Sequence, residues 1–287
     1  MITLSQWQIS SISRSRFRLC CLRTLQALIL KQYLILKYVL FCAIVSTICF
    51  WVVWGTAKLL VRDKTIRGAF VQSSFRGSAA VMGLAFIQNI YGSSAMGPLM
   101  IVSAVPLYNI FSVIVLTFEA NDSTGIDKKA KIRQAGINIC KNPIILSILA
   151  GLIVGLLGIQ FPTLVNKTVS NVAQMATPLA LITIGAGFEG RKALAKIAPT
   201  MAASMIKLVL QPLVFLPVAA WMGFSGEKMI AILIMLASPT TPSCYIMAKS
   251  MNNDEVLTAS VIVTTTLMAA FTLTGWIFLL KTLGYIG

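Results

Sequence analysis

The chain has 287 residues, of which 57% are hydrophobic and only 11% are charged, and its mean hydropathy is +0.85. A soluble domain carries about 25% charged residues, so this composition excludes a soluble globular protein and indicates a polytopic, all-α membrane protein. The net charge of +16 would suit a nucleic-acid partner, but the basic residues cluster in short segments between apolar runs. Membrane topology places them there, and we expect the lipid bilayer, not nucleic acid, as the partner.

Enzymatic and metal chemistry find little support in the sequence. There is no histidine, which removes the commonest general base and metal ligand. The six cysteines show no metal-ligand spacing, and all eight acidic residues fall in loops or at the ends of apolar runs. We therefore expect neither catalytic residues nor a resident metal or cofactor. A sodium/proton antiporter, which would need a buried acid, is also disfavoured.

Residues 1–37 differ from the rest of the chain. They hold six basic residues and no acid, and they lack the clean apolar centre and cleavage site of a signal peptide. An amphipathic helix on the membrane surface is the alternative interpretation of this segment. Beyond this segment, eight apolar runs have the length that spans a bilayer. These predicted spans are 38–61, 69–91, 98–118, 143–161, 168–188, 198–222, 229–249 and 256–281.

The loops predict an orientation. Basic residues follow the first, third and fifth spans, whereas the alternate loops hold few, so the basic loops are expected in the cytoplasm. The same orientation places the six positive charges of residues 1–37 on the outer face, although positive charges are usually kept on the cytoplasmic side. We expect residues 119–142 to form a cytoplasmic loop.

The order of the spans suggests an internal repeat. Span 198–222 corresponds to 38–61, and 229–249 corresponds to 69–91, with the next pair following. The paired spans run in opposite directions, so 38–118 and 143–287 are expected to be inverted repeats. An interrupted helix at matching positions of such repeats points to a transport site.

Span 229–249 contains Pro239 and Pro242 at its centre. Each proline removes a backbone N–H and clashes with the preceding turn. Either the helix breaks here and its carbonyls face protein, water or a ligand, or the prolines only kink a structural helix. Hydroxyl-bearing side chains surround the prolines: Thr240, Thr241, Ser243 and Tyr245.

Span 69–91 carries a polar patch that includes Ser74, Arg76, Gly77 and Ser78. Gly77 permits local unwinding. Arg76 lies deep in the span, so it is either paired or hydrated inside, or it extends back toward the headgroups. Lys207, deep in span 198–222, is expected to face the interior, where it senses substrate or takes the place of a coupling cation. A positively biased site lined by hydroxyls suits an organic anion.

Six stretches carry a family resemblance: GAFVQSSFRGSAAVMGL (68–84), VPLYNIFSVIVL (105–116), NPIILSILAGLIVGLLGI (142–159), ATPLALITIGAGF (176–188), IKLVLQPLV (206–214) and ASPTTPSCYIMAKSM (237–251). In this order and spacing they resemble the auxin efflux carrier family of membrane transport proteins, whose bacterial members include malate and malonate permeases. The resemblance implies two inverted five-helix repeats with interrupted helices that cross, as in bile-acid sodium symporters. It also implies an elevator-type carrier of small organic anions, coupled to H⁺ or Na⁺, that forms a homodimer through scaffold helices in the bacterial inner membrane.

The matching positions place Gly77 and Ser78 at the first break, Pro239 at the second, and Asn109 at a polar position of the next helix. Two departures stand out. Ser78 replaces the family's usual asparagine, and about eight membrane helices are predicted instead of the family's ten. The expectation is therefore a permease for anions such as malate or malonate, with a truncated, non-transporting remnant as the alternative.

Overall fold

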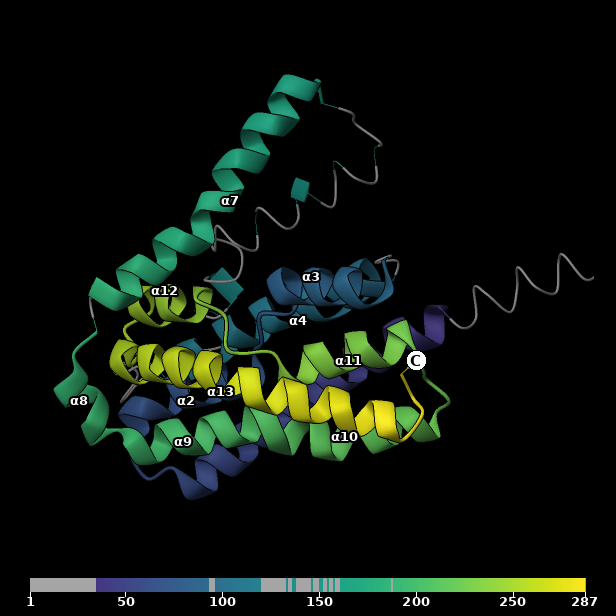
Figure 1. Ribbon diagram of the computed structural model, residues 1–287. Coiled ribbons are helices and arrows are strands. Elements are labelled where there is room, and N and C mark those ends of the chain that lie inside the picture. The colour runs from purple at the N-terminus through teal and green to yellow at the C-terminus, as the bar shows by residue number, and fades with distance from the viewer. Residues whose placement is uncertain are drawn as a thin grey trace, which may run out of the picture. The chain divides into compact units, whose positions relative to one another are not determined.

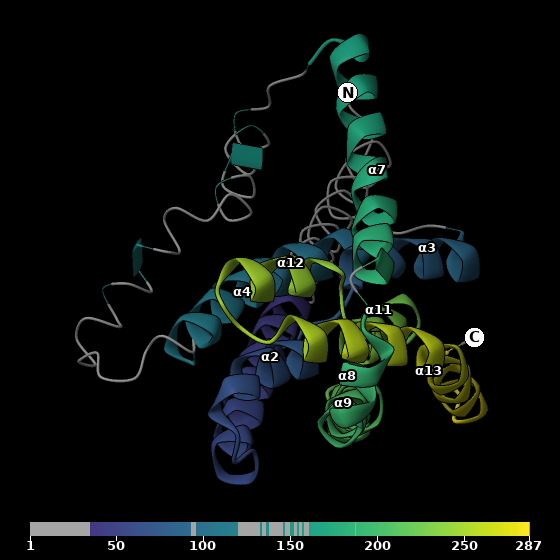
Figure 2. The same ribbon diagram turned by 90° about the vertical axis from the view of Figure 1, so that its left-hand side faces the viewer.

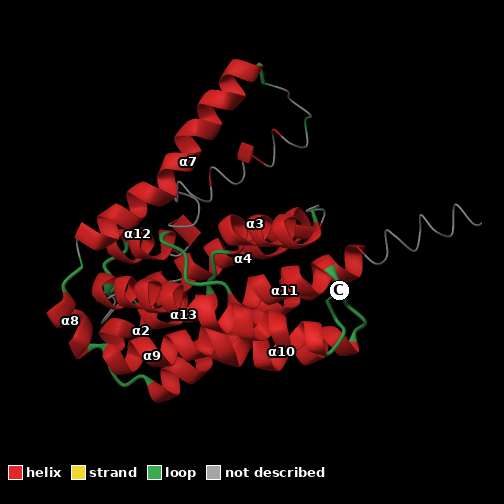
Figure 3. Ribbon diagram, viewed as in Figure 1, coloured by secondary structure: helices red, strands yellow, loops and turns green. Residues whose placement is uncertain are grey.

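The computed structural model describes residues 35–92, 96–119, 161–186 and 188–286, with a few single residues between 133 and 157. The chain forms two compact units, Met1–Phe41 and Cys42–Gly287. The described part of the second unit contains helices and no strands (Figure 3). Three predictions, the basic segment 1–37, the cytoplasmic loop 119–142 and the span 143–161, lie outside the described residues apart from 35–37, 119, 161 and a few isolated positions.

Among the residues that the structure describes, five continuous helices are long and apolar enough to cross a membrane (Figure 1). Their bounds are Ile35–Leu60, Met96–Phe118 (α4), Thr163–Ala186 (α7), Ile197–Trp221 and Glu255–Thr282 (α13). They match the predicted spans to within a few residues. The largest difference is α7, which begins five residues before the predicted 168 because Thr163–Lys167 continues its helical turns.

Two further predicted spans are each divided into a pair of helices. Span 69–91 becomes α2 (Lys64–Phe75) and α3 (Ala79–Tyr91), and span 229–249 becomes α11 (Glu227–Ala237) and α12 (Ser243–Ser250). Helix α2 starts earlier than predicted because Asp63 caps it: its side chain accepts a hydrogen bond from the backbone N–H of Thr65 at 2.9 Å.

The same order of elements occurs twice along the chain. A continuous helix is followed by a broken one and then by another continuous one, first as Ile35–Leu60, α2–α3 and α4, and then as Ile197–Trp221, α11–α12 and α13. The second group begins with α9 (Ile197–Met205), passes through a π-helical turn at Ile206–Leu210, and continues as α10 (Gln211–Trp221). The short α8 (Gly190–Ala195) connects α7 to this group.

Helix α11 forms the centre of the second unit. Its sequence is apolar on every face, and Met229 to Ala237 are all buried, as expected of a helix covered on all sides. It packs against α3, α4, α10 and α13, while α2 packs against α4, α9 and α13. The place of α2 beside α4 can be followed in Figure 2. The two broken helices therefore share α4 and α13 as neighbours.

Aromatic rings join α2 and α4 to the helix Ile35–Leu60. Phe50 stacks on Phe111 with ring centroids 4.4 Å apart, and Phe75 meets the ring of Tyr108 edge-on at 5.9 Å. At the ends of these helices, Glu119 accepts a hydrogen bond from the indole of Trp54 at 2.9 Å and pairs with Arg67 at 3.5 Å. These contacts hold α2 against α4 and the helix Ile35–Leu60.

Candidate functional site

At both breaks a residue with extended backbone ends the preceding helix. Helix α2 ends at Phe75 and Arg76 takes an extended conformation (φ −89°, ψ 127°) before α3 begins. In the second break, Ser238 is extended (φ −68°, ψ 148°) and Pro239 follows it. The ring of a proline disfavours the helical conformation at the residue before it, so α11 has to stop at this point.

The two breaks meet. The backbone N–H of Ser78 donates to the carbonyl of Pro239 at 2.8 Å, and the hydroxyl of Thr240 donates to the carbonyl of Ser73 at 2.8 Å. A Cβ on Gly77 would lie 2.4 Å from the hydroxyl oxygen of Ser238. The prediction of two interrupted, crossing helices is therefore confirmed, and the alternative of a merely kinked helix at Pro239 and Pro242 is wrong. We call the segments Arg76–Ser78 and Ser238–Pro242 the crossing.

On one side of the crossing, helix ends present carbonyl groups to Lys207. The ammonium donates to the carbonyl of Phe75 at 3.2 Å, the carbonyl of Met235 at 3.2 Å and the amide oxygen of Gln211 at 3.4 Å. Phe75 is the last residue of α2, and Met235 lies in the last turn of α11. Lys207 is fully buried, so the prediction that it faces the interior is confirmed.

The π-helical turn sets the position of Lys207. Pro212 follows this turn and cannot donate a backbone hydrogen bond. The carbonyl of Leu208, which an ordinary helix would pair with residue 212, accepts instead from the indole N–H of Trp276 on α13 at 3.0 Å. Such a turn inside an α-helix is frequent at functional sites. Here it directs Lys207 and Gln211 together toward the crossing, where the Gln211 amide also donates to the carbonyl of Ser74 at 2.9 Å.

On the other side, the starts of α3 and α12 flank Arg76. Its guanidinium donates to the hydroxyl of Ser243 at 2.8 Å, to the Met247 sulfur at 2.9 Å and to the Ser112 hydroxyl at 3.4 Å. Arg76 is only 5% exposed. The alternative in which it extends back to the headgroups is therefore wrong, because neutral side chains inside the protein hold it.

This second side is the accessible one. Ser78, Thr241, Pro242 and Ser243 are partly exposed, whereas Ser238, Pro239 and Thr240 are buried. The hydroxyls of Thr241 and Ser243 lie 3.3 Å apart. Neither Ser78 at the start of α3 nor Pro242 at the start of α12 supplies a side-chain cap. Two helix N-termini, an arginine and partly exposed hydroxyls therefore converge here, a combination that favours an anion.

Three predicted site residues make their contacts elsewhere. The Ser74 hydroxyl donates back to Phe70 in its own helix, and the Asn109 amide donates back to Val105. Tyr245 belongs to an apolar cluster with side chains of α7, α12 and α13, among them Ile184 and Ile262. Ser74 still borders the crossing through its carbonyl, whereas the described side-chain contacts of Asn109 and Tyr245 do not reach it.

Sequence reasoning missed several residues that complete the site. Ser112 and Met247 bind Arg76, Gln211 binds Lys207, and the Thr265 hydroxyl accepts from the backbone N–H of Thr240 at 3.1 Å. One signal was available for Gln211, since a polar residue directly before a proline in an apolar span is unusual. Ser112 and Met247 carry no such signal, because serine and methionine are common in membrane helices.

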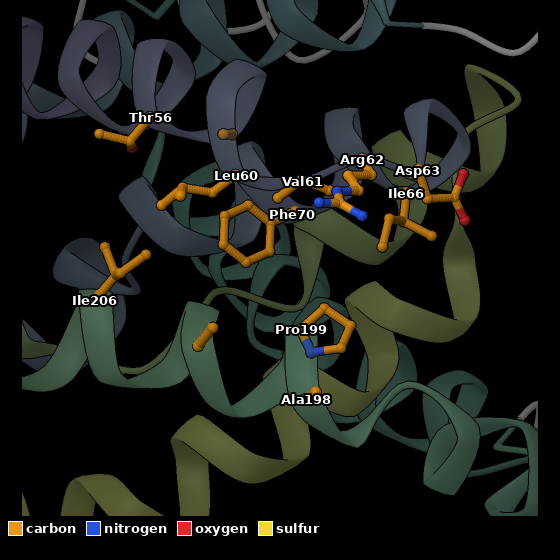
Figure 4. Close-up of a pocket in the computed structure, with 12 residues that line it drawn as sticks. Thr56, Leu60, Val61, Arg62, Asp63, Ile66, Phe70, Ala198, Pro199 and Ile206 are labelled. Carbon is orange, nitrogen blue, oxygen red and sulfur yellow. The ribbon is translucent and has the colours of Figure 1, made fainter.

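A separate cavity of about 420 Å³ lies between the helix Ile35–Leu60, α2 and α9 (Figure 4). Its lining is mostly apolar, with Leu60, Phe70 and Pro199 among the side chains and Arg62 and Asp63 at one end. It does not include the crossing. Within the described residues, no group of His, Cys, Asp or Glu could hold a metal ion.

The helical fold, the spans and the two broken helices define a membrane transport protein. A model of the family described as membrane transport protein matches residues 23–277, and the chain belongs to this family, the auxin efflux carrier family. Among curated proteins, the chain is similar to the uncharacterized transporter YfdV of Escherichia coli K12, with 26% identity over 210 residues. The match covers 71% of this chain and 65% of the relative. YfdV proteins of Escherichia coli O157:H7 and Shigella flexneri match with the same identity and coverage. The chain thus spans about two thirds of the length of these relatives.

Proposed function

We propose that the protein carries small organic anions, dicarboxylates such as malate or malonate, across the bacterial cytoplasmic membrane. The single observation that carries this proposal is Arg76: a buried guanidinium at the crossing that no carboxylate neutralises in the described part of the chain. A buried charge without a partner of opposite sign is energetically costly, so Arg76 favours the binding of an anionic ligand.

The surrounding groups suit a carboxylate. The N-termini of α3 and α12 each contribute roughly half a positive charge, and the hydroxyls of Thr241 and Ser243 can donate hydrogen bonds. Arginine matches a carboxylate in a bidentate manner. A second carboxylate of the same substrate would remain at the partly exposed face beside Ser78. These features support an anion with two carboxyl groups.

The repeated order of elements supports an alternating-access mechanism. In the proposed cycle, the two broken helices and the continuous helices beside them (Ile35–Leu60, α4, Ile197–Trp221 and α13) form a core that moves as a body against the remaining helices, carrying the crossing from one face of the membrane to the other. Because hydrogen bonds join the two breaks, we expect the two broken helices to move together rather than to separate at the crossing. Helix α7 would belong to the static part.

Uptake into proteoliposomes tests the proposal. We expect labelled malate or malonate to enter vesicles that contain the protein and to exceed the level in empty vesicles. Hydrogen bonds to charged groups contribute about 1.5–3 kcal/mol, so Arg76→Gln should raise the half-saturating concentration about tenfold or more.

The matched control is Lys249→Gln. Lys249 is a cation on α12 that pairs with Glu255 at the surface, and its removal should leave uptake unchanged. Thermal unfolding of each variant checks that it is folded. Uptake that equals that of empty vesicles, or Arg76→Gln vesicles that transport like the wild type, would contradict the proposal.

A further inference from the structure

The ammonium of Lys207 lies where two helices end. Its three N–H groups have three acceptors, namely the carbonyls of Phe75 and Met235 at 3.2 Å and the Gln211 amide oxygen at 3.4 Å. The side chain is fully buried. The hydrogen-bonding capacity of a lysine is thereby used completely by oxygen atoms of the protein.

These oxygen atoms compensate the full positive charge of the Lys207 ammonium without a carboxylate. The ion pairs of the described residues involve Arg67, Lys192, Lys196 and Lys249, but not Lys207. The C-terminal end of a helix carries roughly half a negative charge, so the ends of α2 and α11 together supply about one. The ammonium is thus neutralised by the two helix ends.

The backbone is built around this cation. A Cβ on Gly77 would lie 2.9 Å from the Lys207 nitrogen, so only glycine lets the break approach it this closely. The Tyr108 hydroxyl donates to the same Met235 carbonyl at 3.3 Å, and the Tyr108 ring centroid lies 5.9 Å from the ammonium. Both breaks and α4 therefore converge on one positive charge.

In carriers with broken helices, half-helix C-termini and unwound carbonyls hold the coupling cation. We propose that the Lys207 ammonium permanently occupies this cation position as a tethered cation, so that the crossing holds together without a bound sodium ion. The consequence for transport rests on the proposed function: anion uptake does not depend on sodium. Lys207 keeps the helix ends together whether or not the protein transports anions.

Shortening the side chain tests this directly. Lys207→Ala leaves the carbonyls without a cation, and the full-length variant in detergent should unfold at a lower temperature in N-methylglucamine chloride. Ammonium chloride or sodium chloride at the same ionic strength should raise the unfolding temperature of this variant again. This effect should saturate as the cation concentration rises. At ten times the dissociation constant of the cation, the folded-to-unfolded ratio rises about elevenfold. The wild type should respond equally to all three salts.

Two variants serve as controls. Lys207→Met keeps the apolar stem and fills the space, so it should be destabilised and should not respond to small cations. Leu208→Ala shortens the neighbouring buried side chain and should lose stability through packing alone, again without a cation response. If Lys207→Ala does not accumulate in the membrane, Lys207→Ser leaves a similar space and is measured in its place.

The inference is overturned if the shortened variant responds to cations no more than Leu208→Ala does, or if sodium stabilises the wild type to the same degree. Its failure can be told apart from failure of the proposed function. Sodium-dependent anion uptake by the wild type would contradict the tethered cation and leave the carrier intact. If cations stabilise Lys207→Ala but the wild type takes up no anion, the tethered cation is supported and the proposed carrier function is contradicted.

Discussion

Gly77 shows how closely single residues are constrained at the crossing. A side chain there would meet the Ser238 hydroxyl at 2.4 Å and the end of Lys207 at 2.9 Å. The sequence predicted that Gly77 permits unwinding, but its second role, the close approach of the two breaks, depends on residues 130 or more positions away. Such contacts cannot be inferred from a local pattern.

Gly77→Ala should therefore destabilise the protein by about 1–3 kcal/mol, the usual cost of overpacking a buried site. Thermal unfolding in detergent measures this. Gly275→Ala is the control, because nothing lies within 4 Å of its added Cβ. A glycine-to-alanine change inside a helix stabilises by roughly 0.5–1 kcal/mol. Equal effects at the two positions would show that Gly77 is not sterically confined.

At the scale of elements, the sequence and the structure agree where proline or glycine dictates the backbone. The pair Pro239 and Pro242 predicted the break in 229–249, and the structure has it between Ala237 and Ser243. The π-helical turn at Ile206–Leu210 was not predicted, although Pro212 disturbs the helix there. Proline in a membrane helix can produce a kink, a break or a π turn, and the partner of the freed carbonyl decides which. That partner, Trp276, comes from a different helix.

Trp276→Phe tests this explanation of the π-helical turn. It leaves the Leu208 carbonyl without its donor, and an unpaired buried polar group costs about 1–3 kcal/mol. We expect a clear fall in the unfolding temperature. Trp221→Phe is the matched change at a side chain that is 88% exposed, and it should have little effect. If Trp276→Phe also had little effect on the unfolding temperature, the hydrogen bond from the indole to the Leu208 carbonyl would not stabilise the π-helical turn.

The start of α2 predicts a pH dependence. The pKa of Asp63 lies below its usual range because the carboxylate accepts hydrogen bonds from the Thr65 hydroxyl and backbone N–H. A lowered folded-state pKa adds stability above the unfolded pKa of about 3.9, and this is lost as the pH falls through the folded value. Asp63→Asn should thus unfold at a lower temperature than the wild type at pH 7. The difference should shrink below about pH 4, as thermal unfolding at several pH values would measure. A constant difference would contradict this role of the carboxylate.

At the scale of the whole molecule, composition and charge predicted the class of protein and the family motifs predicted the crossing. The contacts of Arg76 were not predictable, because they join α2 to α4 and α12 across the fold. The orientation in the membrane remains a prediction from loop charges. With Cys20, Cys21 and Cys140 replaced by serine, Ser225→Cys should react with an impermeant maleimide in intact cells. Lys192→Cys should react only after permeabilisation. The reverse pattern would contradict the predicted orientation.

The central claim is that an organic anion binds at the accessible side of the crossing, beside Arg76. Thr241→Cys in the same background places a thiol at that side, since Thr241 is partly exposed and Cys42, Cys49 and Cys244 are buried. The most direct measurement is the rate at which a maleimide alkylates this thiol with and without malonate. We predict that malonate slows the reaction at Thr241→Cys in a saturable way and leaves Lys249→Cys, on the exposed surface of the same helix, unaffected. Alkylation of Thr241→Cys at one rate, whatever the malonate or malate concentration, would contradict the claim.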